Sequence, residues 1–246
     1  MTALRKLTLT ELRLFLREPM SVFFAVLFPS VLVAILGNVK AFRKPDPALG
    51  GHRVIDLYVA IAAIFVLAML ALQAAPVVLA TYRERGILRR MSTTPVNPVR
   101  VVAAQLIANM LIALVAVGLV LAVGRIAFDV SLPRNAVAYA VAFLLTSAAV
   151  FALGLFVAAV APNGKAATAI GSLLFFPLMF FAGLWIPREV MPPVLRTIAD
   201  LTPLGAGEEA LRAATTGDWP GLGPVAVLVG YLVAFGLAAA RMFRWQ

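Results

Sequence analysis

The residues best suited to chemistry in this chain are arginines that gather in the run YRERGILRRMSTTPVNPVR, between positions 82 and 100. Guanidinium groups pair strongly with carboxylates and phosphates of a partner. Two interpretations fit: a surface that docks another protein, or a basic loop that sets membrane topology. A short helix here, with a break at Gly86, would carry one charged and one apolar face. The segment comprises Arg83, Glu84, Arg85, Gly86, Ile87, Leu88, Arg89, Arg90 and Met91.

Other reactive groups are scarce. The chain has no cysteine, which excludes disulfides, thiolate metal sites and cysteine nucleophiles, and its one histidine, His52, is interpreted as a loop surface residue. Its Gly164-Lys165 pair is followed by Ala166 and has Ala159 where an ATP-binding Walker A loop needs glycine. We therefore expect no catalytic residues, no metal site and no cofactor on this chain.

Three amide side chains interrupt apolar stretches: Gln73, Gln105 and Asn109. Gln105 and Asn109 are four residues apart and share a helix face. Interhelical hydrogen bonding and the lining of a transport path both explain them. Ionisable residues are almost absent from the same stretches, which weighs against a proton-coupled or sodium-coupled carrier.

The elements that must position these residues are membrane-spanning helices. Of the 246 residues 63% are hydrophobic and only 13% are charged, whereas a soluble domain has roughly 45–50% and about 25%. The net charge of +10 comes from basic residues at the ends of apolar runs, where they meet lipid phosphates, so a nucleic-acid partner is not expected. We predict an all-α integral membrane protein with spans at about 20–39, 54–80, 101–124, 136–161, 166–186 and 222–240.

Two further segments are too polar to span. Residues 1–19 form a predicted interfacial amphipathic helix, with an apolar face of Leu4, Leu7, Leu12, Phe15 and Leu16. Arg5, Lys6, Glu11 and Arg13 are expected largely on the other, polar side, and Arg17 follows as a further basic residue. A simple basic anchor is the alternative. The rest, 20–246, is then the permease domain, and its concentration of arginines in the loop after the second span predicts that both termini are cytoplasmic.

The second polar segment precedes the last span, between Pro187 and Pro220. Two apolar stripes predict a pair of short helices, separated by a turn at Pro203–Gly207, that dip into the outer leaflet as a re-entrant hairpin. Residues singled out in this external segment are Trp185, Pro187, Pro203, Glu209 and Arg212.

These features together resemble a known family. The run Arg83 to Pro95 is similar to the Glu-Arg-Glu-x-Gly-Thr-Leu-x-x-Leu-x-x-Thr-Pro stretch of type-2 ABC exporter permeases, with Tyr82 and Ile87 departing from its Glu and Thr. The later AGLWIP, Pro203-Leu204 and EALR segments resemble that family's signature before the last span.

The resemblance implies a homodimer or heterodimer of permease subunits, each served by a cytoplasmic ATPase subunit that binds ATP and Mg²⁺. It also implies that the N-terminal helix and the Arg83–Thr94 segment contact that ATPase, the latter as a coupling helix. We accordingly expect an exporter of hydrophobic or amphipathic molecules in a bacterial cell membrane, driven by rigid-body coupling. An ATP-independent carrier or channel and an intramembrane enzyme are the alternatives.

Overall fold

The computed structural model describes residues 3–92 and 99–242, and its regular elements are helices apart from one isolated bridge between Pro45 and Arg53. Six helical segments are long and apolar enough to cross a membrane: Pro19–Asn38, Val54–Glu84, Val99–Phe128, Ala136–Val160, Gly164–Phe181 and Leu222–Met242. The predicted all-α, six-span membrane fold is thereby confirmed. The last four spans are the helices α7, α8, α9 and α12.

The first two spans are each built from three pieces with a π-helical segment in the middle. The first is α2 (Pro19–Val22), η1 (Phe23–Leu27) and α3 (Phe28–Asn38), and the second is α4 (Val54–Ala68), η4 (Met69–Ala74) and α5 (Ala75–Glu84). Pro29 and Pro76 follow the two π segments closely. Proline lacks an N–H group and its ring crowds the carbonyl four residues earlier, so a wider turn just before it relieves the clash.

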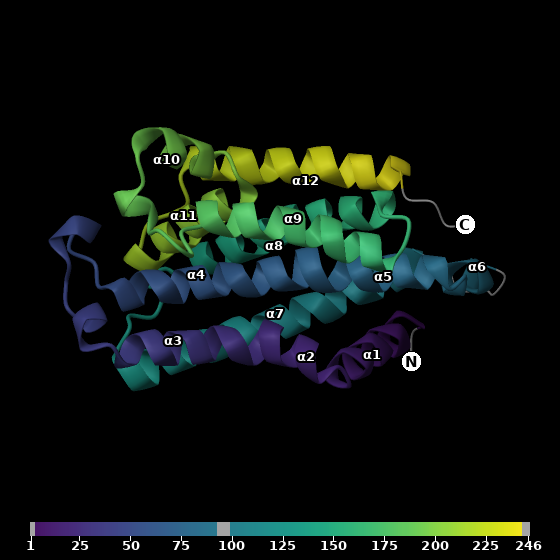
Figure 1. Cartoon of the computed structure of the whole chain (residues 1–246), viewed down its shortest axis with the longest axis horizontal. Helices are drawn as coiled ribbons and strands as arrows, with labels where there is room; N and C mark the ends of the chain where they lie inside the picture. The colour runs from purple at the N-terminus through teal and green to yellow at the C-terminus, as the bar shows by residue number, and fades with distance from the viewer. Residues whose placement is uncertain (1–2, 93–98, 243–246) are drawn as a thin grey trace.

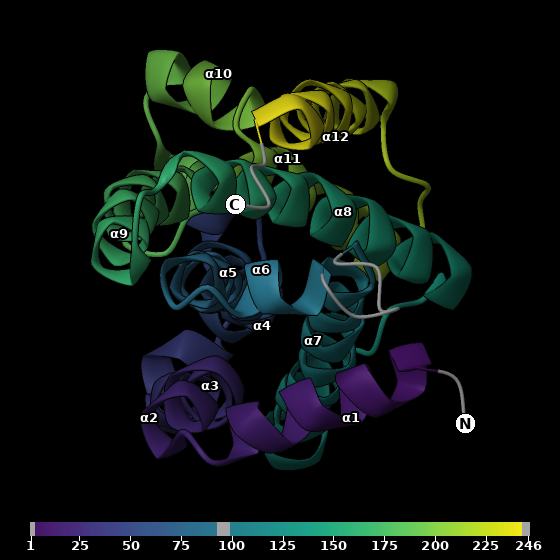
Figure 2. The same ribbon diagram turned by 90° about the vertical axis from the view of Figure 1, so that its right-hand side faces the viewer.

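The second span lies at the centre of the molecule, and most of its apolar part is buried inside the fold. It packs against the first span, α7, α8 and α9, while α12 lies on the outer side of α8 (Figure 2). Glycines bring two neighbours into backbone contact with η4: a Cβ atom at Gly154 would lie 2.0 Å from the Ala71 carbonyl oxygen, and one at Gly171 would lie 2.1 Å from that of Leu72. Small residues at such positions are the usual means of close helix packing in membranes.

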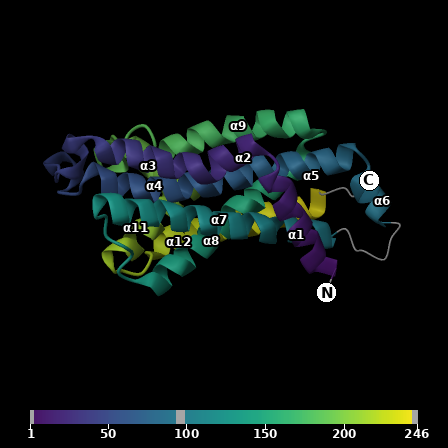
Figure 3. The same cartoon turned by 90° about the horizontal axis from the view of Figure 1, so that it is seen from below.

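The connections gather at two opposite ends of the bundle (Figure 1). One end carries α1 (Ala3–Leu16), the short helix α6 (Ile87–Ser92) and the last turn of α12. The other carries η2 (Lys40–Arg43), η3 (Pro47–Leu49), η5 (Arg188–Val190), α10 (Pro193–Asp200) and α11 (Pro203–Thr216). Figure 3, which views the molecule from below, shows α1 crossing the long helices obliquely, and α1 contacts α7 there.

One predicted span boundary and one predicted turn are wrong. The fifth span ends at Phe181 and not near Ile186, because Gly183 adopts a φ of 96° that reverses the chain. The predicted turn at Pro203–Gly207 is the start of α11, since the Thr202 hydroxyl accepts the backbone N–H of Gly205 at 3.1 Å and caps a helix that opens with proline. The glycines there serve close packing: a Cβ atom at Gly205 would lie 2.1 Å from the Ala199 carbonyl oxygen.

Candidate functional site

The arginine-rich stretch is split by a glycine into the end of α5 and the short helix α6. Gly86 takes a φ of 66°, in the left-handed region that ends helices, and α6 then runs from Ile87 to Ser92 beyond the end of the bundle (Figure 1). Arg85, Arg89 and Arg90 are exposed, whereas Leu88 is fully buried and Ile87 and Met91 are half-buried. Thr93, Thr94 and Pro95 of the family-like run lie outside the described residues.

The base of this stretch is fastened to the connection between α8 and α9. The Arg83 guanidinium donates hydrogen bonds to the carbonyl oxygens of Ala159, at 3.3 Å, and Ala161. The Glu84 carboxylate accepts the backbone N–H of Gly164, the first residue of α9, at 3.1 Å. A carboxylate at a helix N-terminus also interacts favourably with the helix dipole. A displacement of α6 would therefore be transmitted to the fourth and fifth spans.

The N-terminal helix is joined to the second span by a buried carboxylate. Glu11, 8% exposed, accepts hydrogen bonds from the Tyr82 hydroxyl at 3.0 and 3.1 Å. Burial raises the pKa of Glu11, and the hydrogen bond from Tyr82 partly offsets this rise. Phe15 packs against the main core, while Arg5, Lys6, Arg13 and Arg17 are exposed.

The predicted apolar face of α1 needs correction. Leu16 is 68% exposed, whereas Glu11, expected on the polar side, points into the protein. The inward face includes Leu4, Thr8, Glu11, Leu12 and Phe15, positions three or four residues apart that follow one side of a helix, and the predicted Leu12 and Phe15 pack against the core. That spacing was available in the sequence, and it would have identified Glu11.

An outer cavity of about 670 Å³ lies between the first, second and fifth spans. It is apolar apart from the polar groups of Tyr58, Gln73, Ser172 and Trp185. The amide Nε2 of Gln73 donates a hydrogen bond to Oγ of Ser172 at 3.1 Å. It opens at the surface, where Phe176 and Trp185 are 58% and 51% exposed. Its lining residues are Phe24, Phe28, Leu32, Leu36, Tyr58, Phe65, Met69, Gln73, Ser172, Phe175, Phe176, Leu184 and Trp185.

An inner cavity of about 410 Å³ lies at the α6 end of the molecule, between α1, α5 and α7. Gln73 lines both cavities, and the other two predicted amides, Gln105 and Asn109, line this one. The structure thus brings the three amides together at one place. Its lining residues are Glu11, Leu14, Phe15, Arg17, Glu18, Ser21, Gln73, Ala74, Val77, Val78, Thr81, Tyr82, Arg85, Gln105, Ala108, Asn109 and Ile112.

This arrangement of spans and cavities agrees with what comparison with known proteins finds. The family described as ABC-2 type transporter matches residues 2–215. The chain belongs to the ABC-2 type transporter family. Over 251 aligned residues the permease is 23% identical to "Putative transport permease YvfS" of Bacillus subtilis (strain 168), and the alignment covers 100% of this chain and 99% of that protein.

Family and fold together make this permease a multi-pass membrane transport protein. Members of the family are typically paired with an ATP-binding subunit. Among residues 3–92 and 99–242, no group of three or more histidine, aspartate or glutamate side chains is placed to hold a metal ion.

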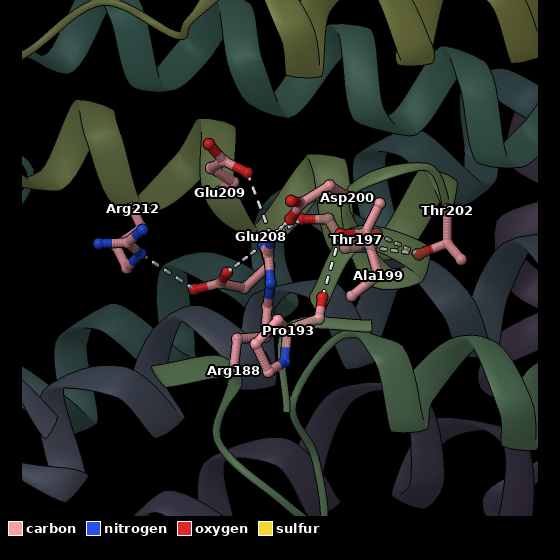
Figure 4. Close-up of polar contacts among 10 residues, drawn as sticks. Arg188, Pro193, Thr197, Ala199, Asp200, Thr202, Glu208, Glu209 and Arg212 are labelled. Carbon is pink, nitrogen blue, oxygen red and sulfur yellow. Dashed lines mark hydrogen bonds and ion pairs between the residues drawn. The ribbon is translucent and has the colours of Figure 1, made fainter. Parts of the chain in front are cut away.

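At the opposite end of the permease, one buried arginine holds together the segment that precedes the last span (Figure 4). The Arg188 guanidinium donates to the Glu208 carboxylate at 2.9 Å and to the Gly205 carbonyl oxygen at 2.6 Å. It also pairs with Glu209, at 3.1 Å, and with Asp200. Arg188 thereby joins the start of the segment to α10 and α11.

The two central side chains of this cluster, Arg188 and Glu208, are 7% and 5% exposed. Burial raises the pKa of Glu208, although the charges of Arg188 and Arg212 oppose the rise. Of the residues singled out from sequence, Glu209 and Arg212 belong to the cluster, and Trp185 lines the outer cavity instead. Pro203 is the first residue of α11, and Pro187 immediately precedes η5. Sequence reasoning did not identify Arg188 and Glu208 as the centre, because their spacing follows no single helix.

Proposed function

We propose that this permease is the transmembrane subunit of an ATP-driven exporter in a bacterial cell membrane, powered by a separate cytoplasmic ATPase subunit that holds ATP and Mg²⁺. Its cargo is a hydrophobic or amphipathic molecule such as a drug-like compound, a lipid or a glycolipid, and it moves outward. The observation that carries the proposal is the position of α6, which projects beyond the bundle with exposed guanidiniums while its base is fastened to the fourth and fifth spans.

The α6 end is the cytoplasmic side in this proposal. It carries α1, α6 and the end of α12, so both terminal helices share a side with the arginine-rich stretch. Basic residues flanking membrane spans favour the cytoplasm. The helix α1, with exposed Leu9, Leu14 and Leu16, would lie in the inner interface, and α10 and α11 would form the external re-entrant hairpin.

The outer cavity is the proposed cargo path. Its lining of aromatic and aliphatic side chains with few polar groups is typical of sites for apolar molecules. Because it is open at the surface between the first and fifth spans, a second permease subunit seated on that face would enclose it. This argument supports a dimer, either of two identical chains or of two related ones.

The mechanism follows from the anchored base of α6. Closure of two ATPase subunits around ATP displaces α6, and the bonds of Arg83 and Glu84 carry that displacement to the connection between α8 and α9. The fifth span, which α9 forms, lines the outer cavity through Ser172 and Phe175. A rigid-body shift of this kind would open the cavity outward.

The test is charge reversal on α6 in vesicles containing both subunits. Replacing Arg85, Arg89 and Arg90 with glutamate should abolish stimulation of the partner's ATPase, while the variant still inserts in the membrane. The matched control reverses three exposed charges at the other end, Lys40, Lys44 and Arg196, and should leave stimulation intact. Retained stimulation in the α6 variant, or transport by the permease without its partner, would contradict the proposal.

A further inference from the structure

The inner cavity changes in polarity along its depth. Its mouth, where α1 meets the end of α5, is lined by two carboxylates and two guanidiniums, those of Glu11, Glu18, Arg17 and Arg85. Deeper in the bundle the walls carry no charge: apolar side chains, with Ile112 of α7 and Val78 of α5 among them, line them together with the amides of Gln73, Gln105 and Asn109. A molecule that fits both regions must be amphipathic.

The location decides which molecules can reach this cavity. The cavity lies beneath α1, the helix whose exposed Leu9, Leu14 and Leu16 suit a membrane interface, and beside spans two and three. Amphipathic molecules at that depth come from the adjoining lipid leaflet. The volume of about 410 Å³ falls in the usual range of small-molecule sites, about 300–1,000 Å³.

One buried group in the cavity lacks a partner. Gln105 is 6% exposed, and its Oε1 atom accepts no hydrogen bond from the described residues. The neighbouring Asn109 side chain donates to the backbone carbonyl oxygen of Gln105 at 3.0 Å and so does not supply that bond. An unpaired buried acceptor is costly, and a ligand N–H or O–H group would satisfy it.

The charges at the mouth select the head group. Neither Arg17 nor Arg85 forms a side-chain ion pair with another residue in 3–92 or 99–242, so both guanidiniums are available to a phosphate. The carboxylate of Glu11 keeps acceptor capacity beyond its bonds from Tyr82. Two acidic and two basic groups disfavour a head group with a single sign of charge, and they match one that carries both signs.

From these features we propose that the inner cavity binds the head group of a zwitterionic phospholipid. The ammonium group lies with Glu11 and the unpaired oxygen of Gln105, and the phosphate lies with Arg17 and Arg85. The acyl chains leave along the apolar wall toward the membrane. This lipid site does not depend on the partner ATPase or on transport.

The test uses the purified, delipidated full-length permease and native mass spectrometry. Phosphatidylethanolamine, phosphatidylglycerol and diacylglycerol with identical acyl chains are titrated separately, and bound lipid per chain is counted. We expect one phosphatidylethanolamine per chain, held at least about tenfold more tightly than the other two lipids, which is the usual contribution of charge-assisted hydrogen bonds. Equal retention of phosphatidylglycerol or diacylglycerol overturns the proposal.

Variants then locate the site. Replacing Arg17 and Arg85 together with glutamine, or Gln105 with leucine, should remove the preference for phosphatidylethanolamine. Arg13→Gln is the matched control, because Arg13 lies four residues before Arg17, is exposed and does not line the cavity. Loss of preference in the control, or its persistence in both site variants, places the lipid elsewhere. If a variant fails to fold, the comparison of head groups on the unaltered permease still decides the question.

Discussion

The Tyr82 hydroxyl and the Glu11 carboxylate form a hydrogen bond of 3.0 Å between residues 71 positions apart. It joins the N-terminal helix to the end of the second span, three residues before the exposed Arg85. The family-like stretch usually has glutamate where this chain has Tyr82, and the tyrosine here donates to an acid supplied by α1. The N-terminal helix α1 and the arginine-rich stretch are therefore one connected unit.

This pair predicts a pH dependence of stability. Burial raises the pKa of Glu11 above its ordinary value of 4.5, so the folded permease holds this proton more tightly than the unfolded chain does. The resulting stabilisation is complete below pH 4.5 and is lost as pH rises through the raised pKa. Thermal unfolding in detergent between pH 4.5 and 8 should show this trend, with a weaker slope in Glu11→Gln. An identical slope in the variant would show that another group is responsible.

The anchor of the arginine-rich stretch can be separated from its docking surface. Arg83→Gln removes the guanidinium that holds the carbonyl oxygens of Ala159 and Ala161, but leaves Arg85, Arg89 and Arg90 in place. We expect the ATPase subunit to bind normally while ATP-driven transport falls roughly tenfold, because charge-assisted bonds of this kind contribute about 1.5–3 kcal/mol. Binding and transport are measured in the same vesicles. A parallel loss of both would contradict a purely transmitting role.

The contact between α8 and the centre of the second span requires glycine at position 154. An added Cβ atom would lie 2.0 Å from the Ala71 carbonyl oxygen, so Gly154→Ala must push two helices apart. A loss of about 1–3 kcal/mol is expected, as for overpacked cores. Gly118→Ala is the control, since nothing lies within 4 Å of its added Cβ atom. Unfolding midpoints that match in the two variants would refute this packing argument.

The ion-pair cluster around Arg188 should respond differently to single and double substitutions. Arg188→Met leaves Glu208 buried without its main partner and should cost about 3–5 kcal/mol, whereas Arg188→Met combined with Glu208→Leu should recover much of that loss. The exposed Arg196→Met serves as control and should change little. Thermal unfolding of the three variants provides the comparison. A double variant less stable than Arg188→Met would argue against burial of an unpaired charge as the cause.

Much of the architecture could be predicted because it depends on local properties. The length of an apolar run decides whether a helix can cross the hydrocarbon core, and each helix satisfies its own backbone hydrogen bonds. Gly86 as the break before α6 follows from the same local chemistry. Local patterns were ambiguous for glycine, which serves both turns and close helix packing. Gly205 lies within α11, where it packs against Ala199 of α10 and does not form a turn.

The amino-acid sequence by itself determined the six spans, the two-faced arginine stretch and the family. Tertiary structure alone decided that Arg83 holds the carbonyl of Ala159, 76 residues away, and that Glu84 caps α9, 80 residues away. It also decided that Gln73, Gln105 and Asn109 line one cavity and that Arg188 meets three carboxylates. The physical reason is that such polar contacts depend on which helix faces are brought together, and no periodicity within a single helix encodes its neighbour.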